Sequence, residues 1–237
     1  MSLGMSVNDL VLIQGMHDTK LALRRWNEHP WSMLRPWAVL SLLIACGLLG
    51  AIYVIAKLST PDPTSYLIPG YNSKATLRDY LAVLYRNSLV LALHAMACVA
   101  GFMAGSSLPL SASKRSGVSR WVHEKAGPLA IGFVICATTF SLCTQAYVIG
   151  GGAAAIAAQL GTTPGMLLLA LVPHALPELF ALFLPLAAWI VASRAGRWQD
   201  LLAATVVTVA ISVPILLGAA AVEIWVSPQL LDAIAAY

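Results

Sequence analysis

The stretch PGMLLLALVPHALPELFALFLPLAAWIVAS, residues 164–193, decides the fold of this chain. Apart from His174 and Glu178, nearly every side chain in it is apolar or small. About 20 apolar residues in a helix are enough to cross the hydrocarbon core of a bilayer, which is about 30 Å thick. The stretch therefore predicts a transmembrane helix.

Residues 173–178, PHALPE, carry two features that a simple transmembrane helix does not need. Pro173 and Pro177 each remove a backbone donor and clash with the carbonyl group four residues back. Glu178 places a carboxyl group where ionisable side chains cost several kcal/mol and usually face a partner or a cavity. We therefore expect this segment to have a packing or functional role.

The composition of the whole chain indicates an all-α integral membrane protein. Hydrophobic residues make up 59% of the 237 residues and charged residues 10%, against about 25% charged in a soluble domain. The net charge of +4 is better explained as a topology signal than as a nucleic-acid surface, for which no motif is present. The cysteines lie in apolar stretches without C-x-x-C spacing, which is typical of core residues and not of metal ligands or disulfides: Cys46, Cys98, Cys136 and Cys143.

Hydropathy predicts five spans, which form one membrane domain over residues 37–237 after a cytoplasmic segment, 1–36. The spans are expected at about 37–56, 87–108, 128–149, 164–193 and 201–226. An imperfect apolar stripe between Asn8 and Trp26 indicates either an interfacial helix or a solvated lead-in. An amphipathic helix that begins near Ser73 should lie on the outer membrane surface before the second span.

Glycines 150–152 are expected to end the third span, because glycine weakens a helix. Residues 153–160 are apolar but too short to cross, so they predict a surface or re-entrant turn of helix. Residues 109–127 are expected to form a basic loop between the second and third spans.

The distribution of basic residues predicts that the N-terminus is cytoplasmic and the C-terminus extracytoplasmic, in a bacterial cytoplasmic membrane. Five spans put the termini on opposite sides, and cytoplasmic loops are enriched in Lys and Arg. Ten basic residues fall on the N-terminal side and four on the other. The ten are Lys20, Arg24, Arg25, Arg35, Lys114, Arg115, Arg120, Lys125, Arg194 and Arg197, and the four are Lys57, Lys74, Arg78 and Arg86.

The short link at 194–199 predicts that the fourth and fifth spans form an antiparallel hairpin. This register places Glu223 within about one helical turn of His174, and Glu178 follows His174 by four residues on the same face. His94 lies in the outer half of the second span. We therefore predict a polar intramembrane cluster of His94, His174, Glu178 and Glu223 on the extracytoplasmic side.

Four interpretations of this cluster remain open. The residues could pair across helices to fix the packing, or form a proton or ion pathway. They could activate water in an intramembrane hydrolase, although H-E-x-x-H and G-x-S-x-G motifs are absent. They could also line a substrate or lipid site where the prolines open the helix. No catalytic residue, metal ligand or cofactor is predicted.

Three motifs resemble the stage II sporulation protein M family over about residues 77–230. They are the Pro173-His174 to Glu178-Leu179 run with Pro177, the end of the fifth span at Ala219-Ala220-Ala221-x-Glu223 with Pro228, and Tyr85-Arg86-Asn87 at the start of the second span. The resemblance implies a five-span protein with a cytoplasmic N-terminus and no catalysis of its own. It also implies a role as a scaffold for peptidoglycan-remodelling enzymes in sporulation, or in the maturation, export or self-immunity of circular bacteriocins.

We therefore expect a non-enzymatic scaffold or assembly subunit that recruits other membrane or extracytoplasmic proteins. The alternative is a component of a peptide export, maturation or immunity system with a polar cavity open to the outside. No nucleic-acid partner is expected. A second copy could pack on the small residues Ala97, Gly101 and Ala104, and packing within the monomer would use the same face.

Overall fold

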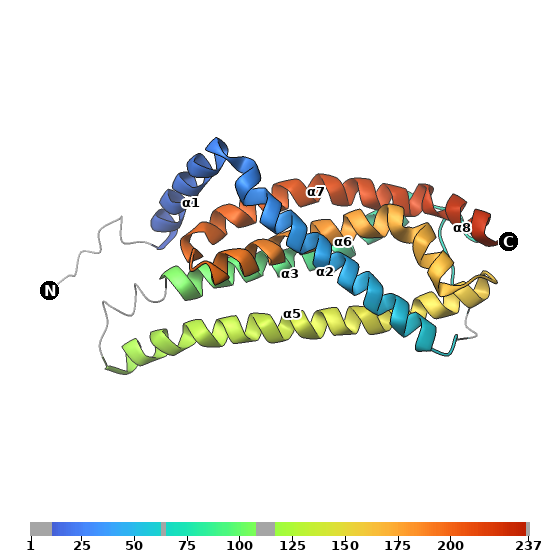
Figure 1. The fold of residues 1–237 in the computed structure, drawn as a ribbon, viewed down its shortest axis with the longest axis horizontal. Coiled ribbons are helices and arrows are strands. Elements are labelled where there is room, and N and C mark those ends of the chain that lie inside the picture. The colour runs from blue at the N-terminus through green and yellow to red at the C-terminus, as the bar shows by residue number, and fades with distance from the viewer. Residues whose placement is uncertain (1–10, 63–64, 108–116, 236–237) are drawn as a thin grey trace. The chain divides into compact units, whose positions relative to one another are not determined.

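The computed structural model describes residues 11–62, 65–107 and 117–235, which form helices and no strands (Figure 1). Five of the helices are long and apolar enough to cross a membrane, so the chain is an all-α, multi-pass membrane protein as predicted. The α-helices are α1 (Val11–Glu28), α2 (Pro30–Leu58), α3 (Leu77–Phe102), α5 (Gly117–Gln159), α6 (Pro164–Arg194), α7 (Leu201–Trp225) and α8 (Ser227–Ala235). A π-helix, η2 (Met103–Ser107), continues α3, and a 3-10 helix, η3 (Trp198–Asp200), precedes α7.

The amphipathic segment before the second span is the start of α3 and not a separate surface helix. Thr76 and Asp79 form a reciprocal cap. The Thr76 N–H and hydroxyl group donate to Asp79 Oδ2 at 2.9 and 2.6 Å, and Asp79 N–H donates to Thr76 Oγ1 at 3.3 Å. Such a cap satisfies the free N–H groups of a first turn, so the helix begins at Leu77. No proline follows before Phe102, and the helix continues into the span.

The prediction that glycines 150–152 end the third span was wrong, because α5 runs through them to Gln159. A Cβ atom on Gly150 would lie 2.8 Å from Ile55 Cβ, so this glycine lets α5 approach α2 closely. In a bilayer, breaking the helix would also leave backbone groups without partners. The helix instead stops at Gly161, which has φ +66°, with Thr162 N–H donating to Ala157 O at 2.9 Å in a Schellman pattern.

The predicted basic loop at 109–127 is also partly helical, since α5 begins at Gly117. Lys114 and Arg115 of that loop, and residues 1–10 of the N-terminal segment, lie outside the described residues.

Helix α6 remains unbroken across Pro173, Pro177 and Pro185. Pro185 lacks the N–H group that would bond to the Ala181 carbonyl, and the Ser212 hydroxyl group of α7 donates to that carbonyl at 2.6 Å instead. The short link between α6 and α7 predicts which residues of the two helices lie at the same depth, and Ala181 and Ser212 agree with that prediction to within one residue. The Ser212 hydroxyl group therefore replaces the hydrogen bond that Pro185 cannot make.

The chain divides into two compact units, and each of the five long helices contributes one part to each unit. Unit 1 takes residues from Met1–Leu40, Ala92–Cys136 and Leu184–Ala210, and unit 2 from Ser41–Leu91, Ala137–Phe183 and Ile211–Tyr237.

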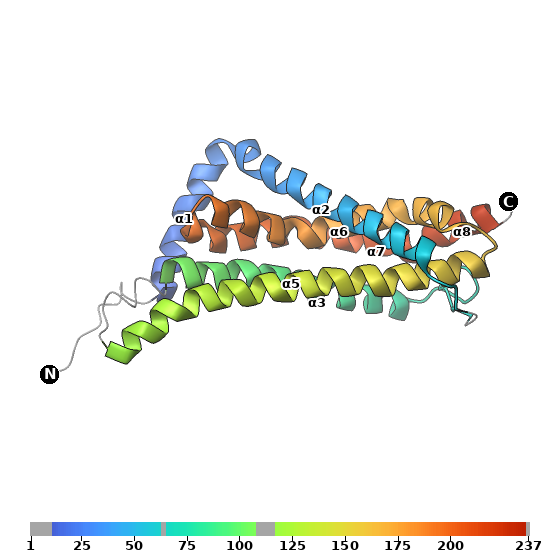
Figure 2. The ribbon, with the colours of Figure 1, turned by 60° about the horizontal axis from the view of Figure 1, so that its bottom comes forward.

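In unit 1, α1 lies beside the end of α3 and the start of α7 in both views of the ribbon (Figures 1 and 2). An ion pair between Arg25 and Asp200 at 2.7 Å and an edge-to-face contact of Trp26 with Trp37 hold the end of α1. The sequence left open whether this segment is a helix or a solvated lead-in, and residues 11–28 are helical.

The small-residue face of α3 is also used inside unit 1. Ala97 and Ala104 are buried, and a Cβ atom on Gly101 would lie 2.7 Å from both Leu201 Cδ1 and Trp189 Nε1. These residues therefore pack within the monomer.

Unit 2 is built on a core of small and aliphatic side chains from the end of α5, the start of α6 and α8. Its buried members include Ala153, Ala154, Ala157, Leu167 and Leu231. The alanines let the helices approach closely, as is usual in membranes. This core positions the polar residues described next.

Candidate functional site

The structure divides the predicted polar cluster between the two units. His174, Glu178 and Glu223 lie in unit 2, together with Arg86 and Asn87. His94 is fully buried in unit 1. The candidate site is therefore built from the unit 2 residues.

His174 forms the most definite contact of the site. Its Nδ1 atom is hydrogen bonded to Ser227 Oγ at 2.6 Å, and both residues are buried, with exposed fractions of 8% and 2%. The bond ties α6 to the first residue of α8. The sequence prediction placed Glu223 within about one helical turn of His174 and missed Ser227. Its Ser-Pro pair, which is typical of a helix start, could have pointed to a second helix beginning there.

Glu178 of α6 and Glu223 of α7 lie near each other and near Arg86 of α3. The two carboxyl groups are close enough to repel each other, and Arg86 is close enough to attract both. The Asn87 side chain lies beside Glu178, although its buried Nδ2 atom forms no hydrogen bond of acceptable geometry. One exposed arginine thus lies near two half-buried acids and offsets part of their charge.

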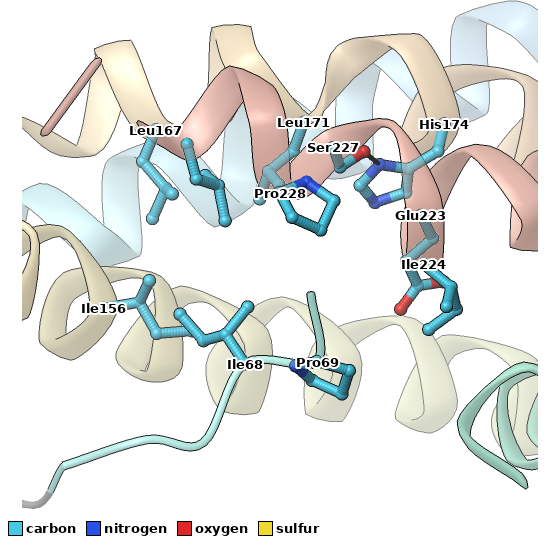
Figure 3. A pocket seen from close by; sticks show the side chains of 11 residues that line it. Ile68, Pro69, Ile156, Leu167, Leu171, His174, Glu223, Ile224, Ser227 and Pro228 are labelled. Atoms are coloured by element: carbon cyan, nitrogen blue, oxygen red, sulfur yellow. Dashed lines mark hydrogen bonds between the residues drawn. The ribbon is translucent and has the colours of Figure 1, made fainter. Parts of the chain in front are cut away.

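A cavity of about 200 Å³ borders this cluster (Figure 3). His174, Ser227 and Glu223 form its polar part, and Figure 3 places them along one wall. The remaining lining is apolar: Ile68, Pro69, Ile156, Leu167, Leu171, Ile224, Pro228 and Leu231. The volume lies below the range of about 300–1,000 Å³ that is usual for small-molecule sites.

A folded loop at residues 66–73 lines part of the cavity with Ile68 and Pro69. Asn72 fixes the loop from inside, accepting from Ile68 N–H at 2.7 Å and donating to Tyr66 O at 2.8 Å. Gly70 has φ +84°, and a Cβ atom there would lie 2.6 Å from Pro228 Cγ. Only glycine suits this position, because it allows both the left-handed backbone and the close approach to α8.

The Gln159 amide ties the same loop to the end of α5. It accepts from Tyr66 N–H at 2.7 Å and donates to Tyr66 O at 3.0 Å, so it pairs with the backbone as a neighbouring strand would. The loop therefore has a defined conformation.

The buried position of Ser227 suits a contact between helices. A nucleophilic serine needs an accessible hydroxyl group and a base oriented by a third group, whereas Ser227 is buried at the start of a helix. Within the described residues, no three His, Cys, Asp or Glu side chains converge as a metal site requires. What the geometry provides is a set of polar contacts that join α3, α6, α7 and α8.

Comparison with protein-family models, with curated proteins and with solved structures finds no match for this chain.

Proposed function

We propose that this protein is a non-enzymatic integral membrane scaffold or assembly subunit that recruits partner proteins at the bacterial cytoplasmic membrane. In this proposal the N-terminus is cytoplasmic and the C-terminus extracytoplasmic, as the distribution of basic residues indicates. The partners are membrane or extracytoplasmic proteins, and cell-wall-remodelling enzymes are the class that the resemblance to the stage II sporulation protein M family favours.

The observation that carries the proposal is the buried hydrogen bond between His174 and Ser227, which joins α6 to α8 beside the charged residues of unit 2. Arg86 of α3 lies near Glu178 of α6 and Glu223 of α7 and attracts both carboxyl groups. Interhelical hydrogen bonds in membranes contribute about 0.6 kcal/mol on average and up to about 1.7. Each contact contributes little to stability by itself, but together the contacts favour one arrangement of helices. A scaffold requires such a fixed arrangement.

The loop at residues 66–73 supports the proposal as a surface for partners. Its backbone is held by Asn72 and Gln159, while Leu67 is 80% exposed. On the predicted orientation this loop is extracytoplasmic. An ordered loop that displays a large apolar side chain costs a partner little ordering entropy on binding.

The test is affinity purification of the full chain from its native membrane, with identification of copurifying proteins by mass spectrometry. We expect a cell-wall hydrolase or another membrane subunit, and we expect its recovery to fall in a Leu67→Asn variant. Leu77→Asn, at a 65% exposed leucine at the start of α3, is the matched control and should recover the partner normally. Recovery of an ATP-binding subunit or of a bound peptide would instead favour the peptide export or maturation alternative.

A further inference from the structure

Unit 1 contains an apolar groove between α1, the end of α3 and the start of α7. Its volume is about 630 Å³, within the range of about 300–1,000 Å³ that is usual for small-molecule sites. Met16, Phe102, Leu202 and Val206 are among the side chains that form its walls. The groove lies outside the polar cluster and plays no part in the proposed function.

The groove offers a ligand almost no hydrogen-bonding partner along its walls. Two threonines line it, but each hydroxyl group donates to its own helix: Thr19 to Gly15 O at 2.7 Å and Thr205 to Leu201 O at 2.9 Å. A ligand that fits such walls presents a long apolar part.

One cation lies at the edge of the groove. Lys20 is exposed and lines it, and none of the described residues that line the groove is acidic. Arg24 follows Lys20 by one turn on the same side of α1 and is also exposed. Arg25 is already paired with Asp200. The positive charges of Lys20 and Arg24 favour a ligand with a negative group at one end.

Contacts at both ends of α1 hold this helix beside the groove. A Cβ atom on Gly15 would lie 2.8 Å from Leu202 Cδ1, so the two helices almost touch there. At the other end, Arg25 holds Asp200 and Trp26 contacts Trp37. The α1 residues that line the groove lie at the first of these contacts or between the two.

We propose that this groove binds one anionic glycerophospholipid, with an acyl chain along the apolar walls and the headgroup phosphate at Lys20. The occupant is a lipid because membrane lipid is the medium around these helices and because the walls need only an apolar chain. It is anionic because the available charge at the edge is positive. Lys20 lies near the middle of α1, which is not one of the five candidate spans, and its long side chain can extend its charge toward a headgroup while its stem covers apolar surface.

The test uses the full chain purified in a neutral detergent and equilibrated with equal amounts of phosphatidylglycerol and phosphatidylcholine. Native mass spectrometry then measures the lipid that stays bound. We expect one bound phosphatidylglycerol per chain. Lys20→Gln should lower the preference for phosphatidylglycerol about fivefold, the equivalent of about 1 kcal/mol for one basic residue at a headgroup.

Two matched controls separate the headgroup and the chain. Val206→Trp fills the groove and should abolish retention of both lipids, whereas Val213→Trp, on the same helix outside the groove, should retain them. Lys57→Gln changes the same type of exposed residue in unit 2 and should leave the preference unchanged. Equal retention by the two tryptophan variants, equal binding of both lipids by the unaltered chain, or a second copy crosslinked into the groove would each overturn the proposal.

Discussion

Replacing Ser227 by alanine tests whether the buried polar contacts stabilise the helix arrangement. The change removes the hydroxyl group that bonds to His174 Nδ1 at 2.6 Å and leaves that nitrogen in a site with an exposed fraction of 8%. A buried polar atom left without a partner costs about 1–3 kcal/mol. The neighbouring cavity of about 200 Å³ has room for a water molecule that could replace the hydroxyl group in part. We therefore expect a loss of about 1–2 kcal/mol in the free energy of unfolding.

The assay is equilibrium unfolding of the full chain in mixed micelles, followed by circular dichroism. Ser88→Ala is the matched control, because Ser88 is exposed and its hydroxyl group donates only to Tyr85 O on its own helix. The control should change the free energy of unfolding by less than about 0.5 kcal/mol. Ser227→Thr keeps a hydroxyl group and should recover part of the loss. Equal effects of Ser227→Ala and Ser88→Ala would refute the reasoning.

Three further changes address other contacts. Arg86→Gln removes the cation near the two glutamates, whereas Glu223→Gln relieves the repulsion between them, so Arg86→Gln should lower the free energy of unfolding more. The same unfolding assay compares the two variants, and the reverse order would contradict the electrostatic account. A double-mutant cycle of Arg25→Gln and Asp200→Asn should give a coupling energy of about 1 kcal/mol, since the arginine is 58% exposed and solvent screens the pair. The rate of amide hydrogen exchange in α1 should rise in both single variants, and an unchanged rate would show that the pair does not hold α1. Gly150→Ala should destabilise the chain, because the added Cβ atom would meet Ile55, whereas the Cβ atom of Gly151→Ala meets nothing within 4 Å and should stabilise the helix by up to about 1 kcal/mol. Thermal unfolding compares the two variants, and equal midpoint temperatures would contradict the close packing of α5 on α2.

The number and approximate position of the spans could be predicted from the sequence, because apolar runs of sufficient length have few alternatives in a membrane protein. Glycines 150–152 and residues 117–127 were misjudged, since glycine and charge are weak helix signals when the alternative is unpaired backbone in lipid. The stop at Gly161 depends on a left-handed backbone conformation that becomes evident only once the preceding helix is known to continue.

The site was predicted in part. His174, Glu178 and Glu223 follow from the register of a short hairpin, and the structure places all three in unit 2. Ser227 could not be predicted as the partner of His174, because the contact depends on a new helix beginning directly after α7 ends at Trp225. The loop that lines part of the cavity was also missed, since it depends on side-chain contacts of Asn72 and Gln159 that have no periodic pattern.

The most direct test of the central claim compares the proteins that copurify with the unaltered chain and with Ser227→Ala, by quantitative mass spectrometry at equal amounts of folded protein. The account predicts that membrane or extracytoplasmic partners are recovered with the unaltered chain and are reduced with Ser227→Ala, because the partners recognise one helix arrangement. Recovery of an ATP-binding subunit or a bound peptide, with no partner sensitive to the change, would contradict the scaffold function.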